Sequence, residues 1–149
     1  MNVTVDIEIK RPKELVWQVI TDIDNWQNVI SSILKINVLN KPSNGLVGLK
    51  WEETREMYGK ESTETMWITD TLQNEYYTTR AESHGSVYIT KVSLIENSGG
   101  SVLTMSFDGP PQTFLAKILS FLLKSLIGKS IKKALIKDLN EIKFHVENN

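Results

Sequence analysis

The chain has 149 residues, of which 40% are hydrophobic and 23% charged, and its formal net charge is -1. This length predicts a single domain over residues 1–149 with a sizeable core, and the apolar fraction is too high for a disordered chain. The absence of cysteine excludes disulfides and thiolate metal sites, and 2 histidines are too few for a metal site built from imidazoles. We therefore expect no metal and no cofactor. The nearly balanced charge argues against a nucleic-acid partner.

Residues 1–10 alternate between apolar and polar side chains, with Val3, Val5, Ile7 and Ile9 on one face. A period of two predicts a half-buried strand. No basic start followed by an apolar run is present, so this segment does not have the pattern of a secretory signal. The most apolar stretch, 114–127, contains two lysines and is shorter than the ~20 apolar residues that cross a bilayer. We therefore expect a cytoplasmic protein without a transmembrane segment.

A pair of short helices is predicted after the first strand. Pro12 ends the strand and is compatible with a helix start, where its missing N–H has no partner in any case. Apolar residues then recur at helical spacing, at Leu15, Val16, Val19, Ile20 and Ile23. Residues 26–30 predict a second helical turn, and residues 33–39 predict a strand that follows it.

The middle of the chain has the pattern of an antiparallel meander. Turn residues recur about every ten positions, at Asn44-Gly45, Gly59-Lys60, Gln73-Asn74, His84-Gly85 and Asn97 to Gly100. Between them lie five predicted strands, over residues 47–58, 61–71, 75–83, 86–96 and 101–107. Together with the two earlier strands they predict a sheet of seven.

Residues 112–147 predict a C-terminal helix with a charge opposite to the rest of the chain. It contains seven lysines and three acidic residues, so it carries +4 and the remaining chain -5. We interpret this as a basic helix packed on an acidic sheet; contact with a membrane surface is the other interpretation. The apolar stripe of this helix changes phase near Gly128, which predicts a kink or break within 125–128 and hence a short first and a long second helix.

The predicted order of elements is a strand, two short helices, six strands and a long helix, which is an α+β fold. One helix covers a seven-stranded antiparallel sheet only if the sheet is strongly curved and wraps around it. We expect a cavity between the concave face of the sheet and the helix.

The chain resembles the START-related helix-grip superfamily (SRPBCC), which includes polyketide cyclase/dehydrase and lipid-transport proteins. The segment IKRPKELVWQVITDIDNWQNV is similar to the first strand and helix pair of that superfamily, and VGLKWEETREMYGK to its third strand and turn. Residues 109–143, which end in Asp138-Leu-x-x-Ile-Lys143, resemble its C-terminal helix. The resemblance covers the whole chain. It implies a helix-grip fold and, because one fold serves many tasks, only a general function of hydrophobic ligand binding.

The predicted strand 47–58 supplies the candidate polar site. Its more apolar face carries Trp51 with Glu53 and Arg55, and residues two apart on a strand share a face, so the two charges can pair inside the cavity. Glu53 is a candidate acid or base and Arg55 a ligand anchor, with Glu64 as a second candidate carboxylate. A purely structural ion pair is the alternative interpretation.

Further ligand-binding candidates lie on the other strands and on the helix. They are apolar or amphipathic side chains that we expect to face inward, namely Met66, Ile68, Tyr77, Tyr88, Met105, Phe107, Leu119 and Leu122. Packing at sheet edges for the tyrosines, and core packing for the two leucines, are the alternative interpretations. The direction in which Trp67 faces is left open: it is either covered by the N-terminal helices or exposed.

Three functions are consistent with these features. The first is binding or transport of a hydrophobic small molecule, such as a lipid or polyketide-like compound, by a monomer or homodimer. The second is a cyclase or dehydratase that uses a buried glutamate, with no catalytic residue assigned firmly. The third is a peripheral membrane or partner-binding protein that uses the basic helix.

Overall fold

The computed structural model describes the backbone of residues 2–57, 59–83, 85–109 and 114–149, and the side chains of the same residues except 57, 83 and 114–128. The first three elements are a strand, an α-helix and a 3-10 helix, namely β1 (Asn2–Ile9), α1 (Lys13–Thr21) and η1 (Ile23–Asn28). Six strands and a helix follow: β2 (Ile33–Asn40), β3 (Lys50–Met57), β4 (Lys60–Leu72), β5 (Tyr76–Ser83), β6 (Ser86–Asn97), β7 (Gly100–Asp108) and α2 (Phe114–Glu147).

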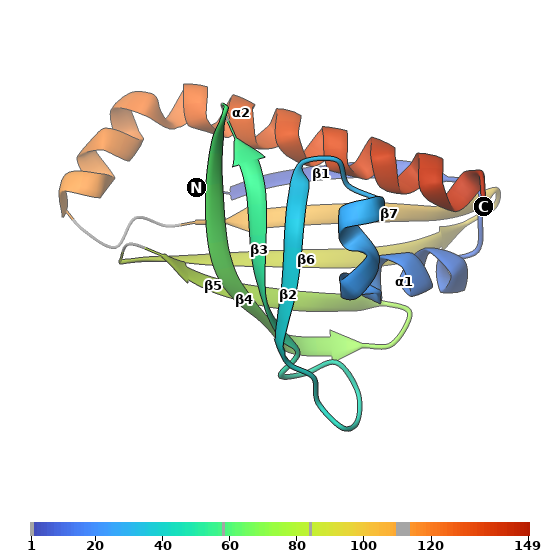
Figure 1. The fold of residues 1–149 in the computed structure, drawn as a ribbon. Helices are drawn as coiled ribbons and strands as arrows, with labels where there is room; N and C mark the ends of the chain where they lie inside the picture. The colour runs from blue at the N-terminus through green and yellow to red at the C-terminus, as the bar shows by residue number, and fades with distance from the viewer. Residues whose placement is uncertain (1, 58, 84, 110–113) are drawn as a thin grey trace.

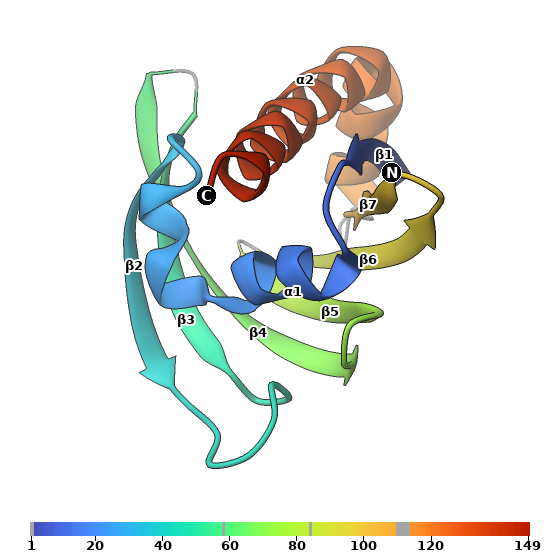
Figure 2. The ribbon, with the colours of Figure 1, turned by 90° about the vertical axis from the view of Figure 1, so that its right-hand side faces the viewer.

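All seven strands form one antiparallel sheet in the order β1-β7-β6-β5-β4-β3-β2. The strands β2 to β7 are joined as a meander, and β1 closes the order by pairing with β7, from Asn2 with Asp108 to Ile9 with Ser101. The sheet is strongly curved, and α2 lies along its concave side (Figure 2). The predicted α+β architecture is therefore confirmed, with α2 packed against β1 and α1.

The hydrophobic core lies where α1, η1 and the C-terminal part of α2 meet the concave face of the sheet. In β1 the predicted alternation is present, since Val5 and Ile9 are buried and Ile7 packs against the core, while Thr4, Asp6 and Glu8 are exposed. Burial of such apolar side chains is the dominant stabilising contribution to the fold. This packing fixes the helices against one end of the sheet.

The helix α1 begins directly after Pro12, as predicted, and buries Val16, Trp17 and Ile20. Leu15 was expected in the same apolar stripe but is 44% exposed. The helix has 9 residues, and its buried face is centred on residues 16 and 20, which leaves position 15 on the flank toward solvent. The expectation for Leu15 was therefore wrong.

The predicted division of the C-terminal helix into two helices is also wrong. α2 is one uninterrupted helix of 34 residues. Its first part, coloured orange, curves away from the axis of its red part (Figure 1). A change of phase in the apolar stripe does not itself break a backbone, and one glycine costs a helix only about 1 kcal/mol. None of the helices in the described part of the chain combines the length and apolar character that a membrane span requires.

Trp67 lies on the convex face of the sheet. It pairs in register with Lys50 on β3 and with Arg80 on β5, and the Lys50 ammonium stands 5.5 Å from the centre of its ring. Trp67 is half-buried beneath this lysine rather than beneath the N-terminal helices. A cation held over an indole face covers part of the ring without any helix.

Candidate functional site

Three side chains of the strand β3 lie in a line on the concave side of the sheet. Trp51 is fully buried and Glu53 is 5% exposed. The Trp51 indole Nε1 donates to Glu53 Oε1 at 3.4 Å, and Arg55 Nε donates to Glu53 Oε2 at 2.6 Å. The pairing of Glu53 with Arg55 that their spacing predicted is therefore present.

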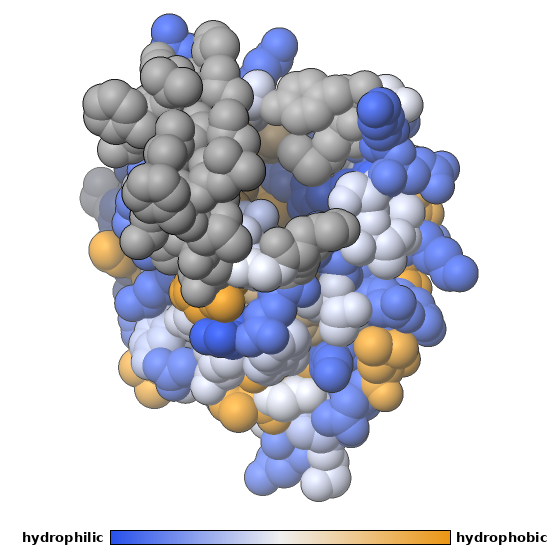
Figure 3. All heavy atoms as spheres, turned by 90° about the vertical axis from the view of Figure 1, so that its left-hand side faces the viewer, coloured by the Kyte–Doolittle hydropathy of each residue, from blue (hydrophilic) through white to orange (hydrophobic). Residues whose placement is uncertain are grey.

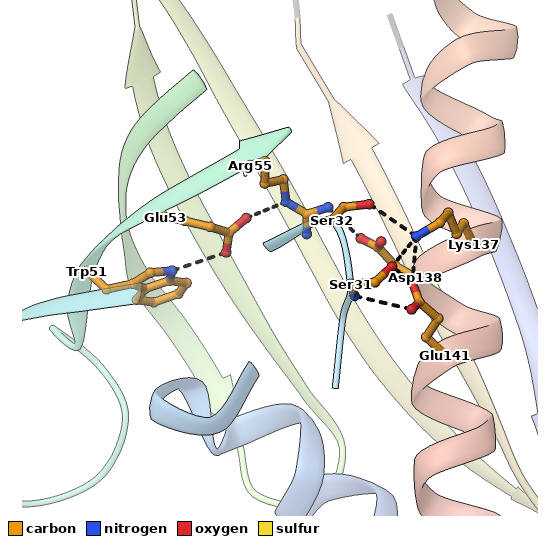
Figure 4. A network of polar contacts seen from close by, with 8 residues as sticks. All are labelled: Ser31, Ser32, Trp51, Glu53, Arg55, Lys137, Asp138 and Glu141. Carbon is orange, nitrogen blue, oxygen red and sulfur yellow. Dashed lines mark hydrogen bonds and ion pairs between the residues drawn. The ribbon is translucent and has the colours of Figure 1, made fainter. Parts of the chain in front are cut away.

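The helix α2 adds a third charged group to this pair. Arg55 Nη1 donates to Asp138 Oδ2 at 2.9 Å, which joins the concave face of the sheet to the helix (Figure 4). Asp138 is 2% exposed. Its second oxygen, Oδ1, is buried and has no hydrogen-bond partner among the described residues. We call Glu53, Arg55 and Asp138 the buried charge cluster.

Burial and charge act in opposite directions within this cluster. Burial raises the pKa of Asp138, and the charge and hydrogen bond of Arg55 offset that rise only in part. For Arg55, burial alone would lower the pKa, but the negative charges of Glu53 and Asp138 outweigh it and raise the pKa above its ordinary value. Arg55 is thus held as a cation between two carboxyl groups.

A second polar network lies beside the cluster on the outer side of α2. Lys137 Nζ donates to Ser31 Oγ, to Ser32 Oγ and to Glu141 Oε1, and Ser31 also donates to Glu141 (Figure 4). Burial would raise the pKa of Glu141, but the bonds from Lys137 and Ser31 prevail and lower it. These bonds fasten α2 to the residues before β2. Lys137 is about half exposed, and none of the four residues of this network lines the cavity between the sheet and α2 that is described next.

A cavity of about 230 Å³ lies between the sheet and α2, with the buried charge cluster in its wall. Its other described lining residues are mostly apolar or aromatic and come from η1, β4, β5, β6, β7 and α2: Trp26, Glu64, Met66, Tyr77, Thr79, Thr90, Val92, Met105, Phe107, Ile131, Ala134 and Leu135. A second compartment of about 230 Å³ shares Glu64, Met66, Thr79, Thr90 and Phe107 and adds Ala81 and Tyr88. Seen from the end where α2 begins, the surface is hollowed (Figure 3).

The structure brings most of the candidate residues together. Glu53, Arg55, Glu64, Met66, Tyr77, Met105 and Phe107 line the cavity, and Tyr88 stacks on Phe107 in the second compartment with ring centres 5.7 Å apart. Trp51 and Ile68 are buried in the core and are not among the described lining residues. Leu119 and Leu122 belong to α2, but their side chains lie outside the described residues, as does the turn residue His84.

Tyr77 contributes its ring to the cavity but not its hydroxyl group. The hydroxyl is buried and donates to the backbone carbonyl of Ile20 at 3.0 Å, at the end of α1. Burial raises the pKa of Tyr77, and the charge of Glu53 adds to the rise. The hydroxyl therefore remains a neutral donor that ties the sheet to α1.

Asp138 is the main residue that the sequence analysis did not assign to the site. It lies three residues after Leu135 and seven after Ile131, so it shares the inward face of α2 with these lining residues. An acidic residue inside an apolar helical stripe was the available signal. Thr79, Thr90, Val92 and Ala134 were also missed, because small or weakly polar strand and helix positions carry no distinctive pattern.

No group of three or more potential ligands among the described residues is arranged to hold a metal ion. The chemistry that the described residues show in the cavity is that of the buried charge cluster and its apolar surroundings. It offers a guanidinium, carboxylates and a large apolar surface, which suits a molecule with one polar end.

A curved antiparallel sheet that holds a long helix over an internal cavity defines the helix-grip class of START-related proteins. Among solved structures, a START superfamily protein from Mycobacterium smegmatis is 12% identical with a TM-score of 0.80, covering 99% of this chain and 97% of that chain. The Zhui aromatase/cyclase from Streptomyces sp. R1128 is 15% identical with a TM-score of 0.78, covering 99% and 94%. A protein from Thermus thermophilus is 13% identical with a TM-score of 0.81, covering 98% and 97%. At these identities the likeness concerns the fold.

The family model described as polyketide cyclase / dehydrase and lipid transport matches residues 1–143. The chain belongs to this family, as its sequence resemblance predicted. No curated protein matches the chain in sequence.

Proposed function

We propose that the chain binds a compact, apolar small molecule in the cavity between the sheet and α2. The observation that carries this proposal is a cavity of about 230 Å³ whose described lining is largely apolar and includes the buried charge cluster. An engineered apolar cavity of about 150 Å³ binds benzene, so this volume suits a molecule somewhat larger than one aromatic ring. The family description, which includes lipid transport, supports the same class of ligand.

The candidate ligand contacts follow from this arrangement. The sulfur atoms of Met66 and Met105 and the ring of Phe107 would pack against the apolar body of the ligand. The buried charge cluster would contact its polar end. Trp51 would act indirectly, by holding Glu53 in place.

Binding of naphthalene, an uncharged apolar probe, tests the proposal. We expect a saturable change in the indole N–H resonance of Trp26, which lines the cavity, and no change for Trp67, which lies on the convex face. Ala134→Phe places a ring in the cavity and should abolish the change. Lys133→Phe adds the same ring at the neighbouring exposed position of α2 and should preserve it. Binding unaffected by Ala134→Phe would contradict the proposed site.

A second candidate function is dehydration or cyclisation of a bound molecule, favoured by the raised pKa of the buried Asp138. A carboxyl group of this kind is suited to give a proton to a leaving hydroxyl group, and Glu64, in the same cavity, to accept one from carbon. One solved structure of the same fold is named an aromatase/cyclase. Incubation with an aryl β-hydroxyketone, followed by the ultraviolet absorbance of the enone, tests this activity. An Asp138→Asn variant that retained the full rate would exclude it.

A further inference from the structure

One carboxylate oxygen of Asp138 is buried in the wall of the cavity without a hydrogen-bond partner among the described residues. Asp138 is 2% exposed and lines the cavity, yet only Oδ2 is engaged, by Arg55. Oδ1 is buried with no hydrogen-bond partner among the described residues. A buried acceptor without a hydrogen-bond donor destabilises the folded state, and such atoms in native structures almost always have a donor. Because Asp138 lines the cavity, the cavity is the place from which that partner comes.

The charges around the cavity limit what that partner is. Its described lining contains three carboxyl groups, on Glu53, Glu64 and Asp138, and one guanidinium, on Arg55. The Arg55 guanidinium already donates to Glu53 through Nε and to Asp138 through Nη1. An anionic ligand would add a further negative charge to a buried site with an excess of carboxylates, and a cationic ligand would lie against Arg55.

We infer that the ligand carries an uncharged hydrogen-bond donor, such as a hydroxyl group, that donates to Asp138 Oδ1, and that the cavity rejects carboxylates such as fatty acids. This inference rests on the proposed function, since it specifies the polar end of the same ligand. A hydroxyl-bearing ring system of about two fused rings satisfies the volume, the apolar lining and the orphaned acceptor together.

Three probes of nearly the same shape separate the possibilities. 2-Naphthol carries a hydroxyl donor, 2-methoxynaphthalene carries an acceptor without a donor, and 2-naphthoate is an anion at neutral pH. Titrations followed by the Trp26 and Trp51 indole resonances report on the cavity and on the residue behind Glu53, with Trp67 as the internal control. We expect 2-naphthol to bind about tenfold to a hundredfold more tightly than 2-methoxynaphthalene, and 2-naphthoate to bind most weakly.

Asp138→Asn provides the matched variant. An asparagine that keeps its oxygen toward Arg55 presents an amide NH₂, a donor, where Oδ1 stood. The preference for 2-naphthol over 2-methoxynaphthalene should then vanish or invert, and 2-naphthoate should gain affinity because one negative charge is lost. Asp24→Asn makes the same substitution at an exposed position of η1 and should leave all three affinities unchanged.

The titrations have different results if only the hydroxyl preference fails and if binding in the cavity fails altogether. If all three probes bind the native chain equally, the inference is overturned while binding in the cavity stands. The strongest binding by 2-naphthoate would overturn it as well. If naphthalene and all three probes leave the Trp26 resonance unchanged, both the proposed function and the inference are overturned. The probe series on the native chain decides these points even if Asp138→Asn fails to fold.

Discussion

Replacing Arg55 with methionine removes the cation that two buried carboxyl groups share. The guanidinium lies 2.6 Å from Glu53 Oε2 and 2.9 Å from Asp138 Oδ2, and the two carboxylate side chains are only 5% and 3% exposed. Breaking a buried ion pair from one side typically costs about 3–5 kcal/mol. Since the Arg55 side chain is 24% exposed, we expect the lower end, about 3 kcal/mol in the free energy of unfolding at pH 7.

Urea unfolding followed by tryptophan fluorescence measures this loss. With an ordinary dependence on urea, about 3 kcal/mol lowers the midpoint by roughly 1.5 M. Arg80→Met is the matched control, because Arg80 also pairs with a glutamate two residues away on one strand, at 39% and 54% side-chain exposure. An exposed pair of this kind contributes about 0–1 kcal/mol. The difference between the two variants therefore isolates the effect of burial.

A triple variant sharpens the test. Glu53→Gln and Asp138→Leu, added to Arg55→Met, remove the uncompensated charges and should restore part of the lost stability. The deficit of Arg55→Met should also shrink as the pH falls, because the buried Asp138 has a raised pKa and its carboxyl group needs no counter-ion once it is protonated. If Arg55→Met costs no more than Arg80→Met, or if the triple variant is less stable than Arg55→Met alone, the electrostatic reasoning is refuted.

Three further substitutions, the first with a control variant, test other parts of the fold. Gly100→Ala should cost about 2 kcal/mol or more, since Gly100 has φ 151° and a Cβ there would collide with the carbonyl oxygen of Ile9. Gly99→Ala, where a Cβ meets nothing within 4 Å, should be nearly neutral in the same urea assay. Tyr77→Phe should cost about 1–2 kcal/mol, because it leaves a buried carbonyl unpaired; a thermal unfolding temperature equal to that of the native chain would contradict this. Glu141 has a lowered pKa, so its contribution to stability is present above its ordinary value of 4.5 and is lost as the pH falls through the lowered one. Glu141→Gln should therefore lose about 0.5–1 kcal/mol at neutral pH and progressively less as the pH falls below 4.5, a pattern that a pH series of unfolding curves can confirm or reject.

The sheet could be predicted from local features because each strand boundary carries its own signal. The alternation from Val3 to Ile9 and the glycine-containing turns at Gly59 and Gly100 identify strands without knowledge of the tertiary contacts. The continuity of α2 could not be predicted in this way. A change of apolar phase indicates where side chains are buried, but backbone hydrogen bonds continue through it at little cost.

The buried charge cluster was predictable only where its residues share one strand. Glu53 and Arg55 are two positions apart, so their pairing follows from the geometry of a strand. Asp138 completes the cluster from a distance of 83 residues along the chain, and no local pattern joins it to Arg55. The hydroxyl of Tyr77 illustrates the same limit, since its partner on α1 is set by tertiary packing alone.

The pairing of β1 with β7 has a consequence for synthesis on the ribosome. The hairpins from β2 to β6 join neighbours in the chain and can close as they emerge, whereas Asn2 must wait for Asp108. Until then β1 presents an unsatisfied strand edge, and among the strand pairings the one that closes the longest loop forms last. Translation speed and chaperone access should therefore affect the yield of this protein most strongly during the interval between emergence of the first and the last strand.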